Sequence, residues 1–319
     1  MKKSLIALAV LGLSGIAMAQ SSVTLYGAAD AGVGKIKAAD AMSDGSGSGS
    51  DASNKTQFIS GSLMNNTDSY LGVRGSEDMG NGLKAGFHFE SGLNLNDGRQ
   101  TDGAFWARQA YMWVAGGWGT FTLGRQFTTS YSLTRTYDLT GTANYSVLGN
   151  TYDYVGGGIR ADSAYGYISP TFNGFTAWGG IVRKADVGIN AWDVAGSYSS
   201  GPIVAGLSIN KSSGGKTSYQ LGGKYNFGSF TLAASYTDAA RPATHLVRRG
   251  FEVGGSVTFG AFSATLDLTR DTRNDWTAKK YTNGVAELKY ALSKRTFLYA
   301  AYLRLDKTNN YGLGINHTF

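Results

Sequence analysis

The sequence predicts an all-β fold, a 16-stranded antiparallel transmembrane β-barrel, and three observations lead to this prediction. Apolar and polar residues alternate with a period of two along most of the chain, the pattern of a strand with one apolar and one polar face. Short turns and longer polar connections alternate between these strands. Charged residues make up only 16% of the 319 residues, against roughly a quarter in a typical soluble domain. Something other than water is therefore expected to cover part of the surface.

The N-terminal segment has the features of a cleavable secretory signal peptide. Lys2 and Lys3 precede an apolar stretch over residues 5–16, and Ala17-Met18-Ala19 offers a cleavage site before Gln20. We expect a signal peptide over residues 1–19 and a barrel domain over residues 20–319. No later run of apolar residues is long enough for a transmembrane helix. Export and the scattered positions of the basic residues argue against a nucleic-acid partner, although the net charge is +7.

The strands and their connections follow from the alternation. The clearest strands cover residues 83–89, 219–227, 251–259, 262–268 and 297–305. Seven short turns are expected near residues 79–82, 116–119, 172–174, 200–201, 228–229, 260 and 293–294, and eight longer connections near 35–68, 96–103, 129–161, 185–190, 211–217, 238–248, 270–281 and 306–311. Fifteen connections join sixteen strands. An even-numbered barrel with short turns on one rim and long loops on the other has this arrangement.

Aromatic residues gather beside the short turns. They are Phe227, Phe230, Phe259, Phe262, Tyr290, Phe297 and Phe319. A ring of aromatic side chains at one height is typical of a membrane–water interface. A soluble β-sandwich is the competing interpretation, but it rarely needs so many long strands in a chain of this length.

Several segments, in the same order along the chain, resemble the trimeric general porins of Gram-negative bacteria, of the β-proteobacterial and neisserial type. They include Gln20-Ser-Ser-Val-Thr-Leu-Tyr-Gly27, Leu71-Gly-Val-Arg-Gly-Ser-Glu-Asp78, Arg108-Gln-Ala-Tyr111, Thr122-Leu-Gly-Arg-Gln126, Leu292-Ser-Lys-Arg-Thr296 and Ile315-Asn-His-Thr-Phe319. The final strand, which ends at Phe319, resembles the signal that the outer-membrane barrel assembly machinery reads.

The resemblance implies a homotrimer in the cell outer membrane, in contact with outer-membrane lipids, lipopolysaccharide and the barrel assembly machinery. Each barrel would form a water-filled channel for passive transport of small hydrophilic solutes and inorganic ions. The third long loop, near residues 129–161, would fold inward and narrow the pore. Its acids Asp138 and Asp153 would then face basic residues on the wall. The wall candidates are Arg74, which points inward if Leu71 and Val73 face lipid, and Arg108, Arg125 and Arg160.

These constriction candidates predict moderate anion selectivity, because the four arginines outnumber the two acids. Gly166 stands where many relatives carry an arginine, which limits the expected preference. The rest of the interior is near neutral, with Lys84, Lys224, Lys289 and Arg304 assigned inward against Glu90, Glu252, Asp267 and Glu287. The alternative functions are a substrate-specific outer-membrane channel or a barrel adhesin. The loop tyrosines Tyr137, Tyr145, Tyr152 and Tyr154 leave the specific channel open.

We expect no enzyme activity, catalytic residue, metal or cofactor. The chain has no cysteine and three histidines, and it contains no metal-binding or nucleophile motif. His88 and Glu90 share one strand face, so a hydrolase with a histidine base is conceivable. A single pair at this spacing is common by chance, and the sequence favours a channel.

Overall fold

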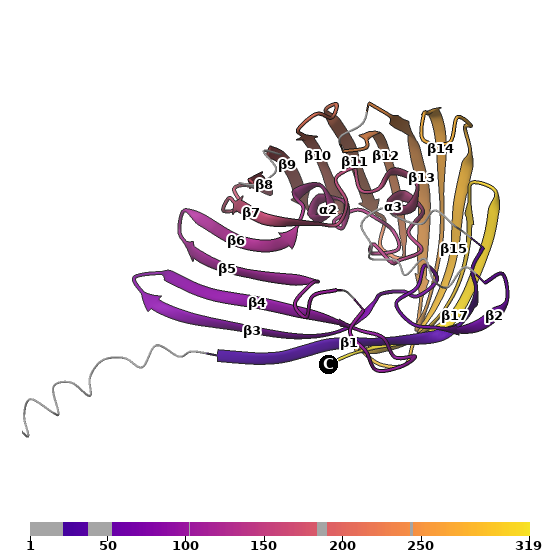
Figure 1. Cartoon of the computed structure of the whole chain (residues 1–319), viewed down its shortest axis with the longest axis horizontal. Helices are drawn as coiled ribbons and strands as arrows, with labels where there is room; N and C mark the ends of the chain where they lie inside the picture. Colours follow the sequence, from indigo (N-terminus) through magenta and orange to yellow (C-terminus); the bar gives the residue numbers. More distant parts are fainter. Residues whose placement is uncertain (1–21, 38–52, 102, 184–189, 243–244) are drawn as a thin grey trace, which may run out of the picture.

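A computed structural model of the chain describes residues 22–37, 53–101, 103–183, 190–242 and 245–319. The expected signal peptide over residues 1–19 lies outside the described residues. No described helix is both long and apolar enough to cross a membrane. The strands are β1 (Ser22–Lys35), β2 (Thr56–Ile59), β3 (Ser69–Gly80), β4 (Leu83–Leu93), β5 (Gln109–Gly116), β6 (Gly119–Phe127), β7 (Arg160–Ile168), β8 (Phe175–Arg183), β9 (Asn190–Ser200), β10 (Ile203–Ser212), β11 (Ser218–Asn226), β12 (Phe230–Ala240), β13 (Val247–Phe259), β14 (Phe262–Asn274), β15 (Thr282–Ala291), β16 (Thr296–Leu305) and β17 (Thr308–Thr318). Two short helices, α2 (Thr129–Thr134) and α3 (Val147–Tyr152), lie inside the curved sheet (Figure 1).

The sheet closes on itself because the last strand pairs with the first. β17 runs antiparallel to β1, from Ala28 opposite Thr318 to Lys35 opposite Tyr311. The other edge of β1 is shared by β3 along its first half and the short β2 along its end. β2 and β3 therefore occupy one strand position, and the seventeen labelled strands form a 16-stranded barrel, as predicted. Closure gives every backbone N–H and C=O an internal partner, which lipid requires.

The seven short turns are confirmed. Short connections join the pairs β3–β4, β5–β6, β7–β8, β9–β10, β11–β12, β13–β14 and β15–β16. The first has Asn81 and Gly82 at positive φ, 53° and 76°, as a type I′ hairpin turn needs. The expected loop over residues 306–311 is wrong. Only Asp306 and Lys307 connect β16 to β17, because Asn309 to Tyr311 continue the ladder with β16.

The outer face of the barrel is apolar. Val253 is 60% exposed and Leu313 is 62% exposed, so these residues cover a surface that faces lipid rather than a core. Six of the seven predicted girdle aromatics are exposed on this face, and they form contacts such as Phe259–Phe262 and Phe262–Tyr290. Phe297 is the exception.

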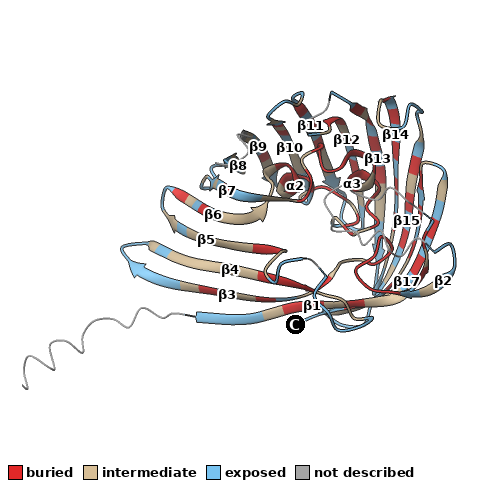
Figure 2. Ribbon diagram, in the orientation of Figure 1, coloured by how far each residue is buried: buried red, intermediate tan, exposed pale blue. Residues whose placement is uncertain are grey.

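Phe297 points inward because β16 has apolar residues on both faces. Its ring lies 5.4 Å from the Lys289 ammonium group. Tyr299, Leu303 and Leu305 share its face and are buried, while Leu298 and Tyr302 are exposed on the other side. The inner residues are covered by the loop that contains the helices and by residues 60–68, the segment between β2 and β3. Figure 2 shows buried residues concentrated in and around α2 and α3.

Candidate functional site

The third long loop, residues 128–159 (called L3 here), enters the barrel and is held by two capped helical turns. The Thr128 side chain accepts a hydrogen bond from the Tyr131 N–H, and the Ser146 side chain accepts one from the Gly149 N–H. Asp153 ends α3 in the left-handed conformation. These caps satisfy backbone groups that would otherwise be buried without partners. The helices then pack against β8–β10 and β12–β16, so L3 lies on one side of the interior.

Small residues of the wall receive the large side chains of L3. A Cβ atom at Gly206 would collide with Leu133, and one at Gly222 would lie 2.5 Å from the ring of Tyr137. A Cβ atom at Gly250 would likewise collide with Tyr152. Because each of these positions needs a glycine for close approach, the wall fixes which face of L3 turns away from the pore.

Hydrogen bonds anchor L3 to the wall at its start and near its middle. At α2, the Ser130 N–H and hydroxyl donate to the Asp193 carboxylate at 2.7 and 2.8 Å, and Thr134 donates to Gln220 at 2.8 Å. Near the middle of L3, Tyr145 donates to Glu287 at 2.7 Å.

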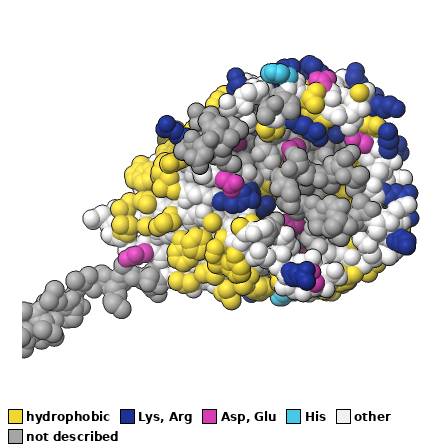
Figure 3. Space-filling view, viewed as in Figure 1, with side chains coloured by type: hydrophobic (Ala, Val, Ile, Leu, Met, Phe, Trp, Pro, Cys, Tyr) yellow, Lys and Arg dark blue, Asp and Glu magenta, His cyan; other side chains and the backbone are white. Residues whose placement is uncertain are grey.

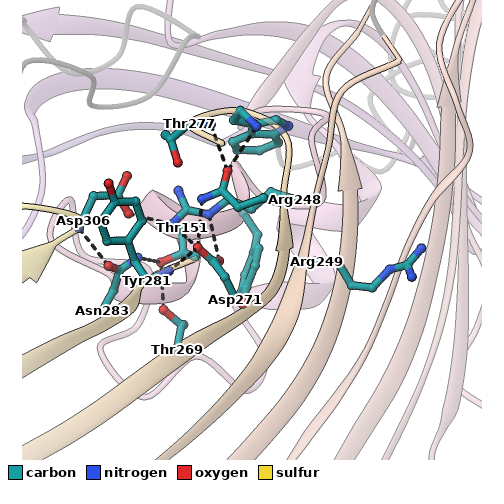
Figure 4. A network of polar contacts seen from close by, with 12 residues as sticks. Thr151, Arg248, Arg249, Thr269, Asp271, Thr277, Tyr281, Asn283 and Asp306 are labelled. Carbon is teal, nitrogen blue, oxygen red and sulfur yellow. Dashed lines mark hydrogen bonds and ion pairs between the residues drawn. The ribbon is translucent and has the colours of Figure 1, made fainter. Parts of the chain in front are cut away.

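A polar network continues from α3 toward the extracellular loops (Figure 4). Asn283 donates to Thr151 at 3.0 Å and accepts from the Asp306 N–H at 2.8 Å. Arg248 bridges Asp306 and Asp271, with N–O distances of 2.7 and 2.9 Å. L3 is thus bound by Asn283, which is connected through Asp306 to the buried guanidinium of Arg248.

The two loop acids predicted at the constriction do not line it. Asp138 is 3% exposed and Asp153 is 7% exposed. The Asp138 carboxylate accepts from the Thr140 N–H and hydroxyl at 2.8 and 2.6 Å, and also from the Ser146 hydroxyl. It therefore holds the fold of L3 itself, and its burial removes it from the surface that solutes meet.

The loop tyrosines also face the wall rather than a solute path. Burial raises the pKa of the Tyr137 and Tyr145 hydroxyls well above its ordinary value, and the nearby Glu252 and Glu287 raise it further. Both phenols therefore stay neutral and add no charge to the pore.

The wall opposite L3 carries Arg74 and Arg108. Arg74 lies on the inner face, in one cross-strand row with His88 and Tyr111, and its guanidinium is 5.0 Å from the ring of Tyr26. It is exposed although it faces inward, so it reaches the water of the interior.

Arg108 is buried in an ion-pair network on the same wall. It binds Asp68 at 2.7 Å, approaches Glu90 at 3.5 Å and lies 4.5 Å from the ring of Tyr70.

Arg135 is a site residue that the sequence analysis missed. It follows α2, is exposed, and places its guanidinium 5.4 Å from the ring of Phe127. The predicted residue Arg160 lies at the same distance from that ring. Arg135 and Arg160 thus approach one ring, so L3 presents a cation beside a basic residue of the wall.

Two predicted inward arginines lie on the outer face. Arg125 pairs in register with Ala110, which pairs with the lipid-facing Phe89, and its guanidinium binds Asp162. Arg304 is exposed in one outer row with Leu268 and Gly284. Neither can line the constriction, because a strand residue of that parity points away from the pore.

Gly166, where the resemblance would place an arginine, does lie on the inner face. A Cβ atom there would collide with Thr122 and lie 3.1 Å from Gln126. The neighbouring strand has filled the space that a larger side chain would need.

A closed barrel with an apolar belt, an inward loop and charged interior residues defines a channel-forming outer-membrane protein. The chain matches the Gram-negative porin family over residues 4–310. It is 31% identical to outer membrane porin protein 32 of Delftia acidovorans, over 98% of this chain and 92% of that protein. It is also 29% identical to an outer membrane porin protein of Bordetella pertussis, over 100% of both chains.

Solved structures agree on the fold. The anion-selective porin from Comamonas acidovorans superposes with a TM-score of 0.75 at 23% identity, covering 94% of this chain and 100% of that one. The trimer form of OmpT from Vibrio cholerae gives 0.70 at 14% identity, covering 94% and 99%. The chain belongs to the Gram-negative porin family, which confirms the resemblance. It is a general diffusion porin of the outer membrane, and its relatives are channels rather than enzymes.

Proposed function

We propose that this porin conducts small hydrophilic solutes and ions with a preference for anions. The observation that carries the proposal is the group of four arginines around the free face of L3. Arg74 and Arg135 are exposed, Arg160 is half-buried, and Arg108 is buried with the carboxylates of Asp68 and Glu90.

The other acids assigned to the interior or to L3, including Asp138 and Asp153, do not reach the surface that solutes meet. Glu252, Asp267 and Glu287 are buried, and Glu287 is bound by Tyr145 and Lys289. Charges at a constriction act at short range, whereas those beyond a Debye length of about 8–10 Å are screened at physiological salt. The exposed Arg74 and Arg135 therefore favour anions. The related Comamonas porin is described as anion-selective, which supports the same sign here.

Reversal potentials in a salt gradient across a planar bilayer test this proposal. The parent channel should be anion-selective, and Arg74→Ala with Arg135→Ala should move it toward neutrality. Arg125→Ala with Arg304→Ala is the matched control, since it removes two arginines from the outer face. A cation-selective parent would refute the proposal. Equal effects of the control and the double variant would place the filter elsewhere.

We also propose the finer features that the family suggests. They are cleavage after Ala19, a homotrimer, insertion by the barrel assembly machinery, contact with lipopolysaccharide and the absence of enzyme activity. At the closing seam Phe319 exchanges backbone hydrogen bonds with Gly27 at 3.1 and 3.2 Å, which supports a role for the terminal residue in assembly. A substrate-specific channel is less well supported, because the tyrosines that suggested it are buried against the wall.

A further inference from the structure

The outer face of β14–β16 contains a groove near its extracellular end. The groove has a volume of about 670 Å³. Its floor is made by the small residues Gly284 and Ala286 of β15. Leu266 and Leu268 of β14 lie on one side and Tyr302 of β16 on the other. The small residues Gly284 and Ala286 between these larger side chains leave a groove that is open to lipid.

The groove continues down the barrel. A second cavity of about 870 Å³ shares Leu266, Leu268, Ala286 and Tyr302 with the first and extends to Ala264 and Ala300. From Arg270 to Ala264 the strand advances six residues, or about 20 Å at roughly 3.3 Å per residue. This is comparable with one leaflet of a membrane whose hydrocarbon core is about 30 Å thick. The lower part therefore has the length and polarity that an acyl chain needs.

The upper end of the groove is basic. Arg270, Lys280 and Arg304 line it and are exposed, and Arg270 donates to Thr282 at 2.9 Å. The one acid among its described lining residues, Asp306, is bound by Arg248 at 2.7 Å. Three cations therefore lie at the upper end of an apolar groove. Among its described lining residues, no unpaired carboxylate competes with an anionic ligand for these cations. Lys and Arg side chains also gather along the upper and right margins in Figure 3, the side on which Figure 1 places β14 and β15.

We propose that this groove binds lipopolysaccharide, with a phosphate of the glycolipid held by Arg270, Lys280 and Arg304 and an acyl chain lying along Gly284 and Ala286. Guanidinium and ammonium groups bind phosphate by charge-assisted hydrogen bonds. The cations lie at the long-loop end of the strands, the level of the outer-leaflet headgroups. The inference rests on the proposed contact with lipopolysaccharide and assigns that contact to the outer face of β14–β16.

The test measures binding of purified, phosphorylated lipopolysaccharide to the folded full-length porin in detergent, by native mass spectrometry over a lipid titration. We expect Arg270→Ala/Lys280→Ala/Arg304→Ala to weaken binding on the order of a hundredfold, given the usual contribution of each basic residue near an anionic membrane surface. Dephosphorylated lipopolysaccharide should bind the parent as weakly as the phosphorylated form binds the triple variant. Ala286→Trp, which fills the groove without changing charge, should also weaken binding.

The matched control is Arg183→Ala/Lys211→Ala/Lys216→Ala, which removes three exposed cations near other long loops. It should bind as the parent does. Equal weakening by the control would mean general charge attraction and overturn the site. Lipopolysaccharide binding that is unchanged both in the groove triple variant and in Ala286→Trp would also overturn the proposed site. The same holds if the groove triple variant loses its oligomer but still binds lipopolysaccharide. Salt-gradient measurements on the groove triple should stay anion-selective, so failure here is distinguishable from failure of the proposed pore selectivity.

Discussion

Replacing Arg248 with alanine should destabilise the barrel far more than replacing an exposed arginine nearby. The Arg248 side chain is 4% exposed and that of Asp271 is fully buried. Without the guanidinium, Asp271 keeps hydrogen bonds from Asn274 at 2.9 Å and from the Tyr281 N–H at 3.0 Å, but its charge is left without a cation. Breaking a buried pair in this way costs about 3–5 kcal/mol.

The control is Arg273→Ala on the neighbouring strand. Arg273 binds Asp275 at 2.8 Å, but the two side chains are 46% and 28% exposed. Exposed pairs contribute about 0–1 kcal/mol. Denaturant unfolding in detergent micelles, followed by tryptophan fluorescence, should therefore separate the two variants by about 2–5 kcal/mol.

A double variant and the open channel give independent checks. Arg248→Ala/Asp271→Ala should recover part of the loss, because the fully buried carboxylate is gone and only the partly exposed Asp306 is left without its cation. Since Asp306 and Asn283 connect Arg248 to L3, Arg248→Ala should also raise the current noise of single channels. If Arg248→Ala and Arg273→Ala lose the same free energy, the assignment of the network as a buried clamp is refuted.

Two further changes test the position of L3 and the seam. Gly222→Val should lower single-channel conductance, because its side chain would push the ring of Tyr137, and L3 with it, off the wall and toward the pore. Gly179→Val is its control, since nothing lies within 4 Å of a Cβ atom there, and equal conductance in both would contradict the docking of L3. Deleting Phe319 should leave little heat-modifiable barrel in the membrane, because two backbone bonds of the seam are lost. Phe172→Ala, an exposed aromatic at a short turn, should assemble normally.

The strands and turns could be predicted because apolar and polar residues alternate wherever one face of a strand contacts lipid and the other faces the interior. The prediction failed where both faces are apolar. In β16, Tyr299 and Leu303 are as hydrophobic as Leu298 and Tyr302, and only the contact with L3 decides which pair is inward. The loop expected at residues 306–311 failed for a related reason. Asn310 looks like a loop residue, but it is buried, and its side-chain oxygen accepts from the Lys37 N–H at 2.7 Å.

Arg74 could be placed from sequence because its strand neighbours fix its parity, whereas Arg125 could not. A register shift between Gly124 and Gln126 interrupts the ladder beside it, and no alternation shows this. Asp138 did carry a local signal, since an aspartate two residues before a threonine often binds that residue's own backbone. The family resemblance favoured the pore instead.

The charge that L3 presents to the pore follows from how the loop packs. Leu133 and Tyr137 are four residues apart, so on a helical turn they share a face, and the glycines at 206 and 222 accept both side chains. Arg135 lies between them in sequence and is therefore turned to the opposite side, where it is exposed. A larger residue at either glycine would rotate or lift this turn and move the cation. The position of the Arg135 cation therefore depends on two uncharged wall positions, Gly206 and Gly222.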